Sequence, residues 1–182
     1  MKNTLLIAVF LTTFALFAQN PYTVSDQDGE EVTEGMVITM NDFGVPDGSF
    51  DYFVTNDSDD DINMRIEFVS ALNADGSGFE LCFDQCFIDL VIGQSIPPPP
   101  NFVTILAGET TPSGNHFAAT IESTEVQDYN FRFYLTDSEG VDIGNDLNFT
   151  YRYDPTLGLN DIKELGVEIT STVIFNAMEV NT

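Results

Sequence analysis

Cys82 and Cys86 are the only two cysteines of the 182-residue sequence, and three residues separate them. In a protein that leaves the cytoplasm, so close a pair first indicates a disulfide. Closing a loop of about five residues stabilises a protein by only about 2 kcal/mol in the chain-entropy model. We therefore expect this bridge to hold the local turn around residues 83–85 and not to staple the whole fold.

Two other chemistries stay open for the cysteine pair. Both thiols together with His116, the single histidine, could form a metal site. A redox-active pair is the second alternative. It has weaker support, because the spacing is not Cys-x-x-Cys and no helix start follows that would stabilise a thiolate.

A run of aspartates suggests calcium binding. Asp57, Asp59 and Asp61 fall at the first, third and fifth positions of an EF-hand loop. The sixth position is then Ile62 where a glycine is needed, and the twelfth is Phe68 where a glutamate is needed, so the segment is not an EF-hand. An irregular calcium site made of these three carboxylates stays open.

A second acidic segment covers residues 26–34 and fails the EF-hand pattern at the same two positions. Asp26 and Asp28 are its candidate calcium ligands. We expect no other cofactor.

Enzymatic chemistry has little support. A Ser–His–Asp arrangement would have to use His116, for which we expect a surface or capping role at the start of a strand, and no Gly-x-Ser-x-Gly elbow is present. Paired carboxylates for glycoside cleavage stay open, because 30 acidic residues form pairs by chance. We expect a protein that is not an enzyme.

The first residues predict where the protein goes. Lys2 precedes an apolar run over residues 5–17, and the small residue Ala18 follows it. This is the layout of a secretory signal peptide, which we assign to residues 1–18. The run is shorter than the roughly 20 apolar residues of a membrane span, so we expect no membrane span in the mature form.

Charge and composition limit the partners. Without the signal peptide, four basic residues remain against 30 acidic ones. Such a surface repels nucleic-acid phosphates and anionic lipids, so we expect no nucleic-acid partner. With 43% hydrophobic and 12% aromatic residues the chain has ample material for a core.

Alternation of apolar and polar residues predicts strands. The clearest are residues 62–69, 129–136 and 147–153, and weaker candidates are residues 32–40, 50–55, 78–83, 87–92, 102–106 and 117–121. No convincing amphipathic helix interrupts them. Short strands without helical crossovers predict an all-β fold, an antiparallel immunoglobulin-like β-sandwich over residues 19–155.

The end of the chain resembles a sorting signal. Residues 159–163 and 166–180 are similar to the opening of the C-terminal sorting domain of type IX secretion cargo in Bacteroidota. Val167 and Ile169 match the first Val-x-Ile strand of that domain, whereas the turn that follows lacks the two prolines of the family. The later strands of the domain do not follow, so we expect residues 156–182 to be a linker and a truncated sorting-domain-like β tail.

The middle of the chain resembles an uncharacterised β-sandwich module of such cargo. Residues 79–82 match a strand that carries the first cysteine, Cys86 matches the second, and residues 107–109 match a later Ala-Gly-Glu turn. The resemblance implies a non-catalytic module for surface or extracellular interaction. If the sorting-like tail is functional, it implies the type IX machinery as a partner, and the module implies a cell-surface protein or a glycan. The location would be extracellular or the cell surface, or the periplasm if the tail is inactive. A calcium-dependent adhesion or glycan-binding domain is the alternative.

Overall fold

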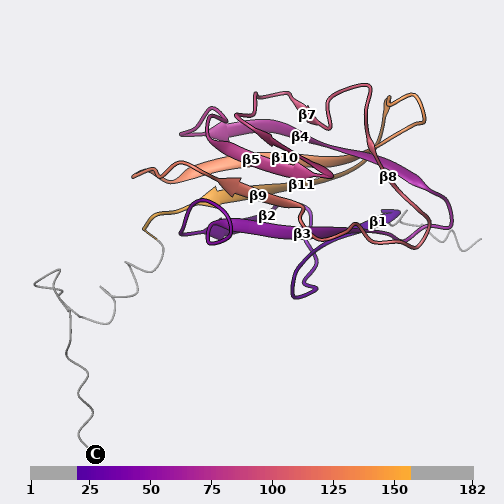
Figure 1. Cartoon of the computed structure of the whole chain (residues 1–182), viewed down its shortest axis with the longest axis horizontal. Coiled ribbons are helices and arrows are strands. Elements are labelled where there is room, and N and C mark those ends of the chain that lie inside the picture. The colour runs from indigo at the N-terminus through magenta and orange to yellow at the C-terminus, as the bar shows by residue number, and fades with distance from the viewer. Residues whose placement is uncertain (1–19, 157–182) are drawn as a thin grey trace, which may run out of the picture.

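A computed structural model describes residues 20–156. The predicted signal peptide and nearly all of the predicted sorting-domain-like tail lie outside this range. Between residues 20 and 156 the chain forms eleven strands and no helix (Figure 1). Accordingly, this range contains no helix that is long and apolar enough to cross a membrane.

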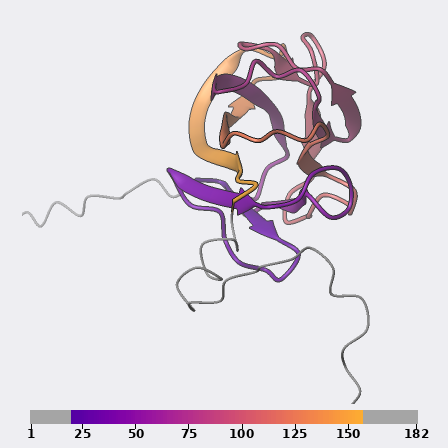
Figure 2. The same ribbon diagram turned by 90° about the vertical axis from the view of Figure 1, so that its left-hand side faces the viewer.

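The strands form two sheets. The five-stranded sheet has the order β1 (Tyr22–Asp26), β3 (Ser49–Asn56), β9 (His116–Ala119), β5 (Phe79–Phe83) and β6 (Gln85–Ile88). The six-stranded sheet has the order β2 (Met36–Met40), β11 (Asp142–Tyr153), β10 (Gln127–Thr136), β4 (Ile62–Leu72) and β7 (Ser95–Ile96), and β8 (Val103–Ile105) also pairs with β4. Seen from one end, the two sheets curve around a common interior (Figure 2).

Aromatic side chains from both sheets meet in this interior. The ring of Phe117 in β9 lies 4.8 Å from that of Phe131 in β10, and the ring of Phe79 in β5 lies 4.3 Å from that of Tyr129 in β10. All four side chains are buried. Face-to-face packing of two sheets over one aromatic core confirms the predicted all-β sandwich.

The strong alternation patterns correspond to the long strands. In β4, for example, Ile62, Met64, Ile66 and Phe68 are all buried. Each such strand turns every second side chain into the core, because successive residues of a strand point to opposite faces of the sheet. The strands β4, β10 and β11 contain the three segments with the clearest alternation, and they extend beyond the predicted ends.

One strand pair departs from the antiparallel arrangement of the sandwich. Strand β2 runs parallel to β11, with Met36 opposite Phe149 and Met40 opposite Tyr153. After β1 the chain leaves the five-stranded sheet and joins the other sheet at its edge, beside a strand that runs in the same direction. A tight hairpin would force two paired strands to be antiparallel. No such hairpin joins β2 to β11, so these two strands can pair in parallel.

Several weaker strand predictions have wrong ends. The segment predicted at residues 87–92 is a strand only as far as Ile88, because Asp89 adopts a φ of 59° and Leu90 bends away to bond Gly76. The segment predicted from residue 32 becomes a strand only at Met36, after Gly35 with a φ of 74°. Strands β1 and β7 were not predicted.

Candidate functional site

The register of the five-stranded sheet places four reactive or charged side chains in one row across four strands. Cys82 of β5 is paired with Cys86 of β6 on one side and with His116 of β9 on the other. His116 is in turn paired with Asp51 of β3. Because Leu81 and Phe83 point into the core, the row lies on the outer face of the sheet.

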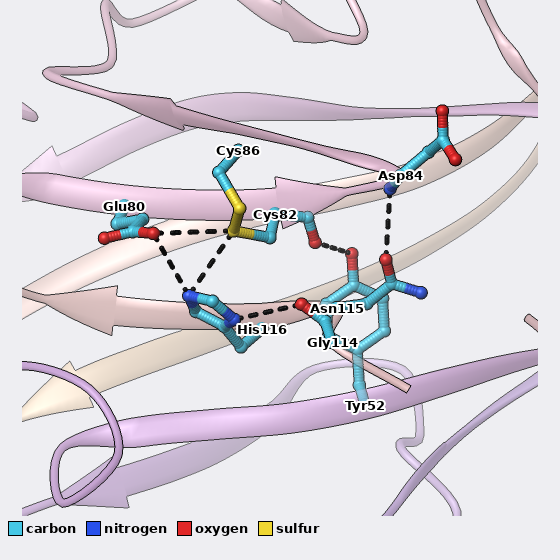
Figure 3. The surroundings of a disulfide bond; sticks show 8 residues. All are labelled: Tyr52, Glu80, Cys82, Asp84, Cys86, Gly114, Asn115 and His116. Carbon is cyan, nitrogen blue, oxygen red and sulfur yellow. Dashed lines mark hydrogen bonds and ion pairs between the residues drawn. A yellow bond between two sulfur atoms is a disulfide. The ribbon is translucent and has the colours of Figure 1, made fainter. Parts of the chain in front are cut away.

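Cys82 and Cys86 are joined by a disulfide in this row (Figure 3). The bond crosses a hairpin whose connection is the single residue Asp84, with a φ of 64°. Aspartate is among the few non-glycine residues that adopt this left-handed conformation readily. The Asp84 backbone N–H donates to Oδ1 of the buried Asn115 at 3.1 Å, which fastens the turn to the start of β9.

His116 lies against the disulfide and not in solvent. Its side chain is only 12% exposed, and its Nε2 lies 3.4 Å from the Sγ of Cys82 and 3.4 Å from Oε1 of Glu80. On the other side of the ring, Nδ1 lies 3.1 Å from the carbonyl oxygen of Gly114 (Figure 3). The carboxylate and the carbonyl are both acceptors, so the imidazolium form, which has two N–H donors, satisfies both of them. Of the expected surface or capping role, the structure shows His116 at the start of β9, with Nδ1 against the Gly114 carbonyl and with the rest of the ring half-buried against the disulfide.

Buried hydrogen bonds hold the strands that carry this site. The Tyr52 hydroxyl donates to the carbonyl oxygen of Cys82 at 3.0 Å, and the Tyr52 backbone N–H donates to that of Asn115 at 3.1 Å. Burial raises the pKa of Tyr52 well above its ordinary value, so this hydroxyl remains a donor at neutral pH. Cys82 and His116 are therefore fixed relative to each other by regular sheet structure.

Glu80, Cys82 and His116 also form a potential metal-binding group. One donor atom from each lies within 4.8 Å of the other two, and no other set of three His, Cys, Asp or Glu side chains in residues 20–156 does so. While Cys82 is bonded to Cys86 it has no thiolate to offer a metal ion. Reduction of the disulfide would supply both thiols, so metal binding by this group remains a prediction for the reduced protein.

The carboxylates of the first aspartate cluster are held by hydrogen bonds to different parts of the chain. Oδ2 of Asp57 accepts a hydrogen bond of 2.6 Å from the Thr23 hydroxyl in β1, and Oδ1 of Asp61 accepts one of 3.0 Å from the backbone N–H of Ala107. Asp59 is exposed between them. Within the described residues these three carboxylates do not come together as a group of metal ligands.

The second cluster forms a turn. Oδ1 of Asp26 accepts hydrogen bonds from the backbone N–H groups of Asp28 at 2.9 Å and of Glu30 at 2.8 Å. This carboxylate thus takes the part of a backbone acceptor at the end of β1, and Asp28 points to solvent. Calcium binding at either cluster stays an alternative that a titration tests.

Comparisons with known proteins give no family. No family model matches the chain, and no curated protein matches it. Among solved structures, the N-terminal domain of PorA is similar, with a TM-score of 0.48 and 18% sequence identity, over 74% of this chain and 98% of that one.

Proposed function

We propose that this chain is an exported, non-catalytic β-sandwich that acts as a surface or extracellular interaction module and is a cargo of type IX secretion. The observation that carries the proposal is the apolar edge at β6. Among the described strands, β6 pairs with β5 alone, and the exposed fractions of Ile88, Val91 and Ile92 are 59%, 65% and 51%. An unpaired strand edge next to exposed apolar side chains is a surface to which an extended segment can bind.

The occupant that this edge fits is an extended segment of a partner protein, added to β6 as a further strand. Backbone hydrogen bonds along β6 would supply affinity, and the apolar side chains of Ile88, Val91 and Ile92 would supply packing. A protein segment fits this edge better than a glycan, because a glycan cannot continue the backbone ladder.

Charge indicates what kind of segment binds. The basic side chains within residues 20–156 are Arg65, Arg132 and Arg152, and each is already bonded inside the molecule. The acidic side chains are far more numerous and mostly face solvent. A basic segment would therefore be attracted, and its association should slow as salt screens the charges.

The location part of the proposal is supported by the disulfide and by the two ends of the sequence. A disulfide persists in oxidising compartments, the first residues have the layout of a signal peptide, and the last residues resemble the type IX sorting domain. Expression in a Bacteroidota host with and without a working type IX system tests this part. Protein at the cell surface only in the intact host is expected, and periplasmic protein in both hosts would contradict it.

To test the interaction part of the proposal, a partner that contacts this protein directly must first be identified. Cross-linking on host cells would nominate proteins, and each would then be purified and titrated against the full chain by calorimetry. An Ile88→Lys/Ile92→Lys variant should bind at least about tenfold more weakly, because it places charge on the apolar edge. Ile121→Lys, at a residue that is 60% exposed in the β9–β10 connection, is the matched control and should bind like the parent. Equal loss in both variants, or in neither, would contradict the proposal.

A further inference from the structure

The two sulfurs of the disulfide differ in access. Cys82 is 2% exposed, with His116 and Glu80 beside its sulfur. Cys86 is exposed on the edge strand β6. A thiolate that attacks a disulfide must approach one sulfur from the side opposite the other, and the choice of sulfur depends on access. An external thiolate can therefore reach Cys86 and is blocked from Cys82.

The sulfur that would leave has a proton donor. Nε2 of His116 lies 3.4 Å from Sγ of Cys82, and the ring is oriented by the Gly114 carbonyl and the Glu80 carboxylate (Figure 3). A neighbouring imidazolium stabilises a cysteine thiolate, and a stabilised thiolate leaves faster in disulfide exchange. The protonated form of His116 would place a positive charge beside the leaving sulfur, as a helix start does in other redox-active pairs.

We infer that the Cys82–Cys86 bridge is an exchangeable disulfide. An external thiolate opens it by attacking Cys86, and Cys82 is the leaving sulfur. The thiolate attacks Sγ of Cys86, a new sulfur–sulfur bond forms there, and the Cys82–Cys86 bond breaks. The electron pair remains on Sγ of Cys82 as a thiolate, which the imidazolium form of His116 stabilises across the 3.4 Å contact. The product is a mixed disulfide on Cys86 and a thiolate at Cys82.

The reverse step restores the starting state. The Cys82 thiolate attacks Sγ of Cys86 in the mixed disulfide, the Cys82–Cys86 bond forms again, and the external thiolate is released. No net oxidation or reduction occurs in this cycle, and the exchange is stoichiometric, so it does not make the protein an enzyme. The inference goes beyond the proposed interaction function, and its test uses a small thiol without a protein partner, so failure of one is distinguishable from failure of the other.

Glutathione is the probe for the test. The oxidised full chain is mixed with glutathione, quenched with acid at intervals, and mapped by peptide mass spectrometry. Glutathione is expected on Cys86, and the His116→Gln variant should open at least about tenfold more slowly, in line with the loss of one positioned acid–base group. Glutathione on Cys82, or an unchanged rate in a folded His116→Gln variant, would overturn the inference.

A second measurement covers the case in which His116→Gln fails to fold. The variants Cys86→Ser and Cys82→Ser each leave one free thiol, at Cys82 and at Cys86 respectively, with His116 intact. The ultraviolet absorbance band of the thiolate is expected at neutral pH only in Cys86→Ser, because only Cys82 lies against His116. Equal bands in both variants, or no band in either, would overturn the inference.

Discussion

His116 Nε2 lies 3.4 Å from the Sγ of Cys82, although the two residues are 34 positions apart along the chain. Antiparallel pairing of β5 with β9 places them directly opposite each other. Two residues at opposite positions of neighbouring strands are held about 5 Å apart by the sheet itself. The contact between ring and sulfur therefore depends on no flexible loop.

The charge of an attacking thiol should affect how fast the bridge opens. Glu80 and Asp84 lie next to the disulfide, and the whole chain has a net charge of −25. At low salt, cysteamine, which carries a positive amine, should open the bridge several-fold faster than 3-mercaptopropionate, and high salt should reduce the difference. Stopped-flow or quenched-flow kinetics at two ionic strengths measures this.

Asp84→Asn is the control for that experiment. Asparagine tolerates the left-handed turn conformation of residue 84 as aspartate does, so only the charge changes. In this variant, the rates at which cysteamine and 3-mercaptopropionate open the bridge should differ less than in the parent. Identical rates for both thiols at low salt would show that surface charge does not steer the approach.

Removal of the bridge should cost little stability. It closes a loop of about five residues, for which the chain-entropy model gives only about 2 kcal/mol. The Cys82→Ala/Cys86→Ala variant should therefore remain folded, with a free energy of unfolding lowered by about that amount in urea titration. The reduced parent protein serves as the control and should match it. Complete unfolding of either would mean that the bridge staples the fold.

The sequence predicts the long strands well and the site only in part. Alternation locates β4 and β10 because their inward residues are large and apolar, whereas β7 has two residues and no period to detect. Glu80 and Cys82 could have been placed on one face, since they are two apart in a predicted strand. The contact with His116 could not, because alternation gives the face of a residue and not the register between distant strands.

Calcium should leave the protein unaffected. Asp57 accepts a hydrogen bond from Thr23, and Asp61 accepts one from Ala107. The Asp26 carboxylate accepts a hydrogen bond from the backbone N–H of Asp28 in the turn that follows β1. Since a ligand that binds the folded state raises its melting temperature, millimolar Ca²⁺ is expected to leave the melting temperature unchanged. A calcium-dependent rise that Asp59→Asn abolishes would instead support the predicted site.

Arg65 should contribute to stability by joining two loops to β4. It is buried, its Nε donates to the Asn101 carbonyl at 2.6 Å, and its Nη1 donates to the Gly140 carbonyl at 2.7 Å. Lysine cannot reproduce this fork, so Arg65→Lys should lower the free energy of unfolding by about 1–3 kcal/mol. Arg152→Lys is the matched control, because Arg152 bonds Asp128 at the surface, and it should cost less than about 1 kcal/mol. If urea titration shows that both substitutions lower the free energy of unfolding by the same amount, the stabilising role of Arg65 is contradicted.

Buried tyrosines should make the fold sensitive to alkali. Burial raises the pKa of Tyr129 and that of Tyr151 to about 12 each, against about 10 in an unfolded chain. Between these values the unfolded state loses protons that the folded state keeps. The contribution of these tyrosines to the free energy of unfolding is therefore constant below pH 10 and falls as the pH rises toward 12.

Tyr151→Phe isolates one of these groups. The Tyr151 hydroxyl donates to the Gly48 carbonyl at 2.7 Å, so its loss should cost about 1–3 kcal/mol at neutral pH. Above pH 10 the variant should lose stability less steeply than the parent, by up to about 1.4 kcal/mol per pH unit, since it has one proton fewer to lose. Tyr134→Phe serves as the control for losing a hydroxyl, because the Tyr134 hydroxyl donates to Ser95 at 2.9 Å. Urea titrations at several pH values measure all three proteins, and parallel slopes for the parent and Tyr151→Phe would show that Tyr151 ionises in the folded state as easily as in the unfolded state.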